Sequence, residues 1–273
     1  MRSDTVVAIL EKLGVARPAP DLAGLRSAYS AWCRAVPFDN VLKLTHLADG
    51  RTGPLPGSTA ESFFETWLEH GTGGTCWAGN AALHDLLEAL GFDVTRAIAT
   101  MLSSPESRGP NHGTVIVTVE GAQWIADASI LSGKPIRIPA ADEPRAAGPL
   151  PRFQWFDSSP AVVWQTPTAP DGVPCRIDKI GAEAGEWDAL HQQTGNWSPF
   201  NYQLNARDHA RRDEHRHLLG TAVRARRERL DVDMEARPQR ARPLPGRGDR
   251  HLRGDRRTGP RRPRPVPPRA EAH

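Results

Sequence analysis

The spacing of apolar residues changes at Gly91, and this change most constrains how the chain can fold. Before Gly91, apolar positions recur as on one face of a helix, over residues 4–13, 22–33, 58–68 and 76–90. After Gly91, apolar and polar residues alternate as in strands, over 92–99, 112–119, 123–128, 134–138 and parts of 152–177. Helices followed by strands predict an α+β protein with segregated parts. We therefore expect a helical bundle over residues 1–90 and a strand domain over residues 91–205.

Local signals predict how the second and third helical segments are connected. Ser58, with Glu61 three residues later, is typical of a capping box at the start of the third helix. Pro37 disfavours helical backbone beside it, so we expect an extended or turn entry into residues 38–42. Residues 44–58 contain several glycines and prolines and are predicted to form a loop.

The composition is that of a globular protein with free thiols. The chain has 273 residues, 38% of them hydrophobic, which is enough for one large or two modest domains. No apolar run approaches the roughly 20 residues that span a bilayer, and the charged N-terminus lacks the features of a secretory signal. We expect a cytoplasmic protein without a membrane partner. Cys33, Cys76 and Cys175 are too widely spaced for a zinc site or a disulfide framework, so we expect no metal.

Residues 206–273 differ in composition from the rest of the chain. They contain 20 Arg, no Lys and 10 acidic residues, so the net charge of +3 combines a basic tail with an acidic body. The tail has no Phe, Trp or Tyr, which predicts disorder with at most a short helix over 209–230. A basic tail for nucleic acid or an acidic partner is the rival interpretation. The lack of Lys and of interleaved aromatic residues argues against nucleic acid.

Three residues have the chemistry of an activated nucleophile. Cys76 follows a glycine-rich approach and begins a predicted helix, where unpaired N–H groups favour a thiolate. His112 opens one predicted strand, and Asp127 closes the next strand across a short turn. If the three meet, the thiolate attacks, the imidazole accepts its proton and the carboxylate sets the imidazole tautomer. We predict that Cys76, His112 and Asp127 catalyse a covalent acyl transfer.

Each of these residues also has a purely structural interpretation. A cysteine at a helix start is more often a small buried apolar residue, and a histidine at a strand end often bonds at the surface. Asp127 would then cap its strand. Gly73 and Gly74 favour the interpretation of Cys76 as a nucleophile. Glycine adopts backbone conformations closed to other residues, which suits a tight turn that presents a side chain. Asp127 lies in an apolar context and needs a partner, which a histidine on the neighbouring strand provides.

The ordered motifs of the chain resemble the arylamine N-acetyltransferase family over about residues 5–207. They are Pro37-Phe38-Asp39-Asn40, Gly73-Gly74-Thr75-Cys76 with Asn80, the segment 86–94, His112, Asp127 and the segment 196–201. The resemblance implies a helical N-terminal bundle, a β-barrel domain, an α/β lid and a papain-like Cys-His-Asp core. It implies a ping-pong reaction from acetyl-CoA, as co-substrate, through Cys76 to the nitrogen of an arylamine or hydrazine. In that reaction His112 is the base and Asp127 orients it, and no permanently bound cofactor is expected.

The chain departs from the family pattern in several places. Thr72 and Ala78 stand where the family usually has Arg and Glu, and Ser129 stands in a stretch where it usually has Gly. No lid is recognisable after Arg207, and we expect the lid to be absent or replaced by the tail. An alternative reading frame would explain the tail's composition. Two alternatives for function stay open: an amide synthase that releases a carrier-bound acyl chain onto an amine, and an inactive remnant of the fold. A cysteine protease is compatible with the triad alone.

Overall fold

The first third of the chain is helical. In the computed structural model, it contains α1 (Ser3–Leu13), α2 (Leu22–Ala35), α3 (Val41–Ala48), α4 (Ala60–His70) and α5 (Cys76–Ala89), with the short strand β1 (Phe38–Asp39) between α2 and α3. The structure describes residues 1–103, 109–140, 142–143, 148–156, 158–166 and 169–207. Within these ranges, no helix has the length and apolar character needed to cross a membrane.

The segment between α2 and α4 differs from its prediction, because residues Val41–Ala48 form a helix. The extended entry after Pro37 covers only β1, because α3 already begins at Val41, and the predicted loop over 44–58 begins only after α3. Oδ1 of Asp39 accepts from the N–H of Val41 at 3.1 Å, and the C=O of Asn40 accepts from the N–H of Leu44 at 2.9 Å. The Asn40 side chain is in turn bonded to residues about 160 positions away. Local signals missed α3 because distant residues fix its start.

The N-cap of α4 is Thr59, one residue later than predicted. Its side chain accepts from the N–H of Ser62 at 3.2 Å. The hydroxyl of Ser58 instead donates to the C=O of Leu55 at 2.6 Å. Ser62, and not Glu61, therefore lies three residues after the cap, and its hydroxyl donates to the C=O of Thr59 at 3.0 Å.

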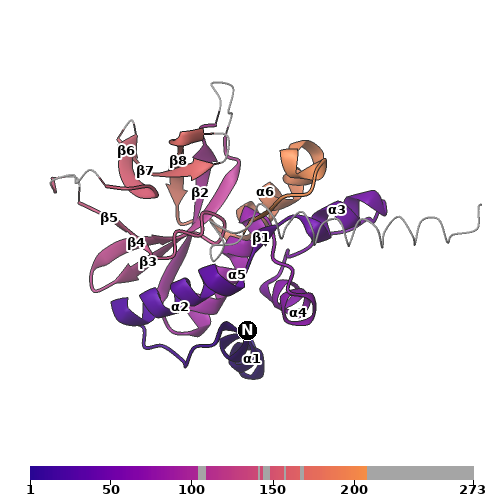
Figure 1. Cartoon of the computed structure of the whole chain (residues 1–273), viewed down its shortest axis with the longest axis horizontal. Helices are drawn as coiled ribbons and strands as arrows, with labels where there is room; N and C mark the ends of the chain where they lie inside the picture. The colour runs from indigo at the N-terminus through magenta and orange to yellow at the C-terminus, as the bar shows by residue number, and fades with distance from the viewer. Residues whose placement is uncertain (104–108, 141, 144–147, 157, 167–168, 208–273) are drawn as a thin grey trace, which may run out of the picture. The chain divides into compact units, whose positions relative to one another are not determined.

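Seven antiparallel strands form one sheet in the order β5-β4-β3-β2-β8-β7-β6. The strands are β2 (Asp93–Met101), β3 (His112–Val119), β4 (Ala122–Ala126), β5 (Ile136–Ile138), β6 (Arg152–Phe156), β7 (Ser159–Thr166) and β8 (Ala169–Ile180). The edge strands β5 and β6 contact each other, so the sheet curls into a nearly closed barrel (Figure 1). This order of elements confirms the predicted α+β fold with helices before a barrel.

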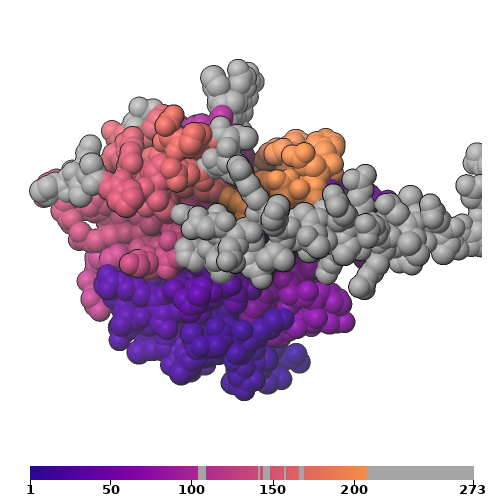
Figure 2. Space-filling view, viewed as in Figure 1, coloured from indigo at the N-terminus to yellow at the C-terminus, as the bar shows by residue number. Residues whose placement is uncertain are grey.

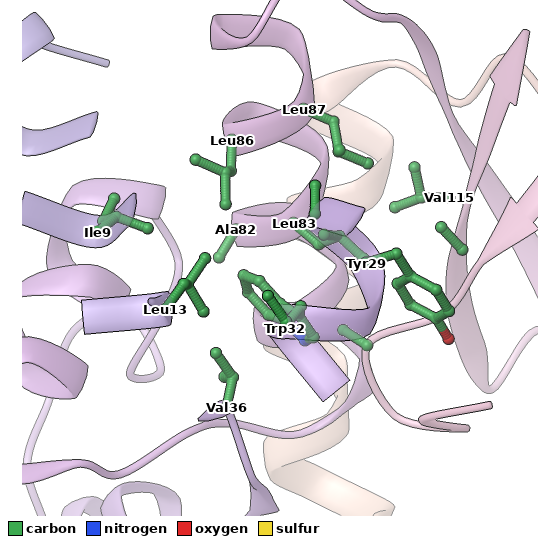
Figure 3. Close-up of a cluster of buried hydrophobic side chains, with 14 of the residues drawn as sticks. Ile9, Leu13, Tyr29, Trp32, Val36, Ala82, Leu83, Leu86, Leu87 and Val115 are labelled. Carbon is green, nitrogen blue, oxygen red and sulfur yellow. The ribbon is translucent and has the colours of Figure 1, made fainter. Parts of the chain in front are cut away.

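Helix α5 joins the helical part to the sheet. It packs against α4 on one side and against β2 and β3 on the other. Figure 3 shows Leu83, Leu86 and Leu87 of α5 among apolar side chains of the first two helices and Val115 of β3. In the space-filling view, the indigo helices meet the pink strands directly (Figure 2). Because α5 is buried on both sides, its first residue is held firmly against the sheet.

The chain returns to helical structure after the sheet. Helix α6 (Ala184–Trp197), the 3-10 turn η1 (Pro199–Asn201) and strand β9 (Ala206–Arg207) follow, and β9 pairs with β1 in antiparallel fashion. None of these elements was predicted. Trp187 of α6 packs on Trp77 of α5 with ring centroids 4.9 Å apart, so α6 lies next to the start of α5. The predictions for the tail from residue 208 onward, including the helix over 209–230, lie outside the described residues.

Candidate active site

Two glycines before Cys76 bring the chain against β1. Cys76 is the first residue of α5 and is only 7% exposed. A Cβ at Gly73 would lie 1.8 Å from the carbonyl oxygen of Pro37, so a larger residue does not fit. The N–H of Gly73 donates to Oδ2 of Asp39 at 2.7 Å. Neither Gly73 nor Gly74 has a positive φ. The glycines therefore serve close approach, and neither uses the left-handed conformations that glycine allows.

His112 and Asp127 meet through a direct hydrogen bond. Nε2 of His112 lies 2.7 Å from Oδ2 of Asp127, and the two side chains are 3% and 2% exposed. His112 begins β3 and Asp127 follows β4, and the antiparallel pairing of these strands brings both residues to the same end of the hairpin. With Nε2 engaged by the carboxylate, Nδ1 is the ring nitrogen left to exchange a proton with another group.

The other oxygen of Asp127 is fully used by hydrogen bonds. Oδ1 accepts from the hydroxyl of Ser129 at 2.7 Å, from the N–H of Ser129 at 2.8 Å and from the N–H of Ile130 at 2.9 Å. Burial alone would raise the pKa of Asp127, but the charge of His112 and these bonds hold it well below its usual range. Asp127 is therefore ionised at neutral pH.

The surroundings of His112 favour its charged form. Burial lowers the pKa of His112, because it disfavours the charged imidazolium. The electrostatic effects of Cys175, Asp127 and Cys76 raise this pKa by more, so it lies above its usual value. We attribute the rise mainly to Asp127. Burial raises the pKa of Cys175 to about 12, so this thiol carries no charge at neutral pH. The stable state of the pair is thus an imidazolium bonded to a carboxylate.

Asn80 and Tyr29 hold the segment that carries Asp127. Asn80 is fully buried on α5, where Nδ2 donates to the C=O of Gly113 at 2.7 Å and Oδ1 accepts from the N–H of Ala128 at 2.8 Å. The hydroxyl of Tyr29 donates to the C=O of Asp127 at 2.8 Å. Asn80 therefore ties α5 to β3 and to the turn after β4. The sequence indicated Asn80 only as part of a motif and did not indicate Tyr29, whose one signal was a hydroxyl on an apolar helix face.

Thr72 and Ala78, which stand on either side of the nucleophile candidate in the sequence, are small and buried. Thr72 is 7% exposed and Ala78 is 2% exposed. Oγ1 of Thr72 has no hydrogen-bond partner among the described residues, and Ala78 packs closely against Gly57 and Gly74. This corner beside the nucleophile candidate is therefore held by packing and not by an ion pair.

Cys76 and His112 line one cavity of about 860 Å³. Its walls are rich in aromatic side chains, namely Phe38, Trp77, Trp164, Trp197 and Phe200. Lys43 and Arg207 bring positive charge to it, whereas its described lining includes no Asp or Glu. Cys76 and His112 do not share a hydrogen bond in the described structure. The geometry thus joins His112 directly to Asp127 and places Cys76 at the same cavity.

A second cluster of ligand-type side chains lies on α5 outside this cavity. His84, Asp85 and Glu88 have atoms close enough together to hold a metal ion. Oδ1 of Asp85, however, already lies 2.6 Å from Nη2 of Arg96 and 2.8 Å from Nδ1 of His84. The positive charge of Arg96 already neutralises Asp85. These contacts are therefore those of a structural ion pair between α5 and β2.

Sequence comparisons relate the chain to known acetyltransferases. Residues 21–152 match the profile of a family described as N-acetyltransferase. The arylamine N-acetyltransferase of Mycolicibacterium smegmatis is 29% identical over 148 residues, which are 52% of this chain and 50% of that protein. Proansamycin X synthase of Amycolatopsis mediterranei (strain S699) is 28% identical over 172 residues, 59% of this chain and 61% of the synthase. The chain thus spans about half to three fifths of the length of these relatives.

Comparison with solved structures shows the same fold. The arylamine N-acetyltransferase of Salmonella typhimurium has a TM-score of 0.60 at 20% identity, covering 77% of both chains. The Mycobacterium marinum arylamine N-acetyltransferase in complex with CoA has a TM-score of 0.61 at 18% identity, covering 74% of this chain and 76% of that one. With the sequence match over residues 21–152, these likenesses show that the chain has the fold of the arylamine N-acetyltransferases.

Proposed function

We propose that this protein is an acyltransferase that moves an acyl group from a thioester to an amine through Cys76. One observation carries the proposal: Cys76 at the start of α5 and His112, which is bonded to the buried Asp127, line one aromatic cavity. A thiolate beside an imidazolium is a strong nucleophile toward a thioester. The sequence similarity to a mycobacterial arylamine N-acetyltransferase supports acetyl-CoA as the donor and an arylamine or hydrazine as the acceptor.

The proposed reaction has two half-reactions. First, the Cys76 thiolate, whose proton resides on His112, attacks the thioester carbonyl carbon, and the C–S bond to CoA breaks. CoA leaves as a thiol with the proton from His112. The amine nitrogen then attacks the acyl-enzyme, His112 removes a proton from that nitrogen, and the acyl–sulfur bond breaks as His112 returns the proton to Cys76. Asp127 holds His112 through Nε2 and stabilises its positive charge in both steps.

Mass spectrometry of the intact protein tests the proposal. After incubation with acetyl-CoA, we expect a gain of one acetyl group, which is lost when an arylamine is added. Cys76→Ala should show no gain. Asp127→Asn should slow acylation by about 10³- to 10⁴-fold, because the imidazole tautomer is no longer set. A folded wild-type protein that gains no acyl group from any thioester would overturn the proposal and favour an inactive remnant.

A second candidate function changes only the donor and acceptor. The match to proansamycin X synthase extends over more of the chain than the match to the mycobacterial acetyltransferase. An amide synthase would use the same thiol, imidazole and carboxylate to release a carrier-bound acyl chain onto an amine. Acylation of Cys76 by an acyl-carrier thioester, at a rate well above that with acetyl-CoA, would favour this alternative.

A further inference from the structure

Arg207 places a positive charge in the wall of the cavity. It lies in β9, paired with Phe38 of β1. Its guanidinium carbon is 4.3 Å from the ring centroid of Phe38 and 4.6 Å from that of Trp164 in β7. A planar cation stacked on two aromatic rings has little freedom of orientation, and its N–H groups remain at its edge to meet a planar anion. The same cavity contains Cys76 and His112.

The charge of Arg207 is not balanced by a carboxylate among the described residues. None of them forms an ion pair or hydrogen bond with its guanidinium, and no described Asp or Glu lines the cavity. Burial lowers the pKa of Arg207 to about 10, against the effect of Asp127 and Cys76, so it stays charged at neutral pH. A half-buried cation without a partner is costly, and an anionic ligand would remove that cost.

The other cation of the cavity is already engaged. Nζ of Lys43 donates to the C=O of Thr194 at 3.2 Å and to its Oγ1 at 2.8 Å, and the side chain is buried. Burial also lowers the pKa of Lys43 to about 8. Lys43 therefore ties α3 to α6, whereas Arg207 has its donors left for a ligand.

We propose that Arg207 selects acceptor amines whose aromatic ring carries a carboxylate or a similar anionic group. The anion would pair with the guanidinium while the ring packs against the aromatic walls and the amine faces Cys76. The acceptor is favoured over the donor as the source of the anion because Arg207 and Cys76 share one cavity. The phosphates of CoA are separated from its thioester by the whole pantetheine arm. This inference rests on the proposed acyl transfer and adds the substrate class to it.

The acceptor half-reaction tests the inference most directly. We would measure deacylation of the acetyl-enzyme by 4-aminobenzoate and by its uncharged analogue 4-aminobenzamide. Arg207→Gln should lower kcat/KM for the aminobenzoate by about 10- to 100-fold, as expected for loss of a charge-assisted pair, and change that for the amide by less than about threefold. Arg207→Lys, which keeps the charge without the planar fork, should retain part of the preference.

Controls separate the inference from structural and donor effects. Arg26→Gln removes another stacked arginine, 5.8 Å from the Trp124 ring centroid and outside the cavity, and should change neither acceptor rate. An equal loss with both acceptors in Arg207→Gln would show a structural role and overturn the inference. Loss of acylation by acetyl-CoA, but not by the phosphate-free S-acetyl-N-acetylcysteamine, would overturn it in favour of donor phosphates.

A binding measurement keeps the inference testable if acyl transfer fails. Should no thioester acylate folded protein, the proposed function is wrong, but calorimetry with the two acceptors still tests the pairing. Wild-type protein should bind 4-aminobenzoate more tightly than 4-aminobenzamide, and Arg207→Gln should lose that difference. Equal affinities in the wild-type protein would overturn the anion preference itself.

Discussion

The hydroxyl of Ser129 donates to Oδ1 of Asp127 at 2.7 Å, while Oδ2 of the same carboxylate lies 2.7 Å from Nε2 of His112. The Ser129 hydroxyl is a side-chain donor to a buried charge, beside the two backbone N–H groups that donate to the same oxygen. One oxygen of the carboxylate thus bonds to Ser129 and the other to His112. The bond from Ser129 lowers the pKa of Asp127, although the effect of His112 is larger.

Removing that hydroxyl should destabilise the protein. Ser129→Ala loses a hydrogen bond to an ionised acceptor, so we expect the free energy of unfolding to fall by about 1.5–3 kcal/mol at pH 7. Urea denaturation measures the change. Ser30→Ala is the matched control, because the Ser30 hydroxyl accepts only from Arg34 on the exposed side of α2, and we expect about 0.5 kcal/mol or less. Equal effects of the two substitutions would contradict the role of Ser129.

Loss of the Asn80 amide should be more costly still. Asn80→Ala leaves the C=O of Gly113 and the N–H of Ala128 without their buried partner. We expect a loss of about 2–6 kcal/mol in unfolding free energy, since each of the two buried unpaired groups costs about 1–3 kcal/mol. Gln123→Ala removes an exposed amide from β4 and should cost about 0.5 kcal/mol. A urea midpoint for Asn80→Ala close to that of Gln123→Ala would refute the bridging role.

The His112–Asp127 pair should stabilise the fold within a defined pH window. The pKa of Asp127 is lowered, so its contribution is present above the unfolded value of about 3.9 and is lost as pH falls toward the folded value. The pKa of His112 is raised, so its contribution is full below about 6.5 and is lost as pH rises through the folded value. The stability difference between wild type and Asp127→Asn should be largest between about pH 4 and 6.5. Urea midpoints across pH 2–9 measure it, with Asp49→Asn, in an exposed pair with Arg51, as a control without such a maximum.

The three cysteines should differ in reactivity. Burial raises the pKa of Cys33 and of Cys175 to about 12, so at pH 8 both are almost entirely protonated and unreactive. Cys76 lines the cavity. Limiting iodoacetamide should therefore modify Cys76 first, as peptide mass mapping would show, and folded Cys76→Ala should remain nearly unlabelled. Modification of Cys175 as fast as Cys76 would argue against this assignment.

Two glycines make a matched pair for packing around the site. A Cβ at Gly113, next to His112, would lie 2.3 Å from the ring of Trp187 and 2.8 Å from that of Trp77. Gly113→Ala should lower the unfolding free energy by about 1–3 kcal/mol through overpacking. A Cβ at Gly185 in α6 would meet nothing within 4 Å, so Gly185→Ala should raise it by about 0.4–1 kcal/mol. Thermal unfolding of both variants checks the signs, and a stable Gly113→Ala protein would mean that Trp187 can move freely.

The sequence by itself determined the main elements and the identity of the site candidates. Helices α1, α2, α4 and α5 and strands β2, β3 and β4 follow the apolar period, which is a local property of each segment. Cys76 at a helix start and His112 and Asp127 at strand ends were likewise visible in the pattern. Their catalytic roles, and the division of the chain at residues 90 and 205, stay predictions.

Only the tertiary structure decided which residues meet. Helix α3 starts from contacts with residues about 160 positions later, and α6 has few apolar residues apart from Trp187, which packs on α5. The β1–β9 pairing sets Arg207 beside Phe38 in the cavity wall. The physical reason is that an apolar period specifies which face of a segment is buried but not against which partner. Partners are chosen by the packing of the whole chain, where contacts distant in sequence add up.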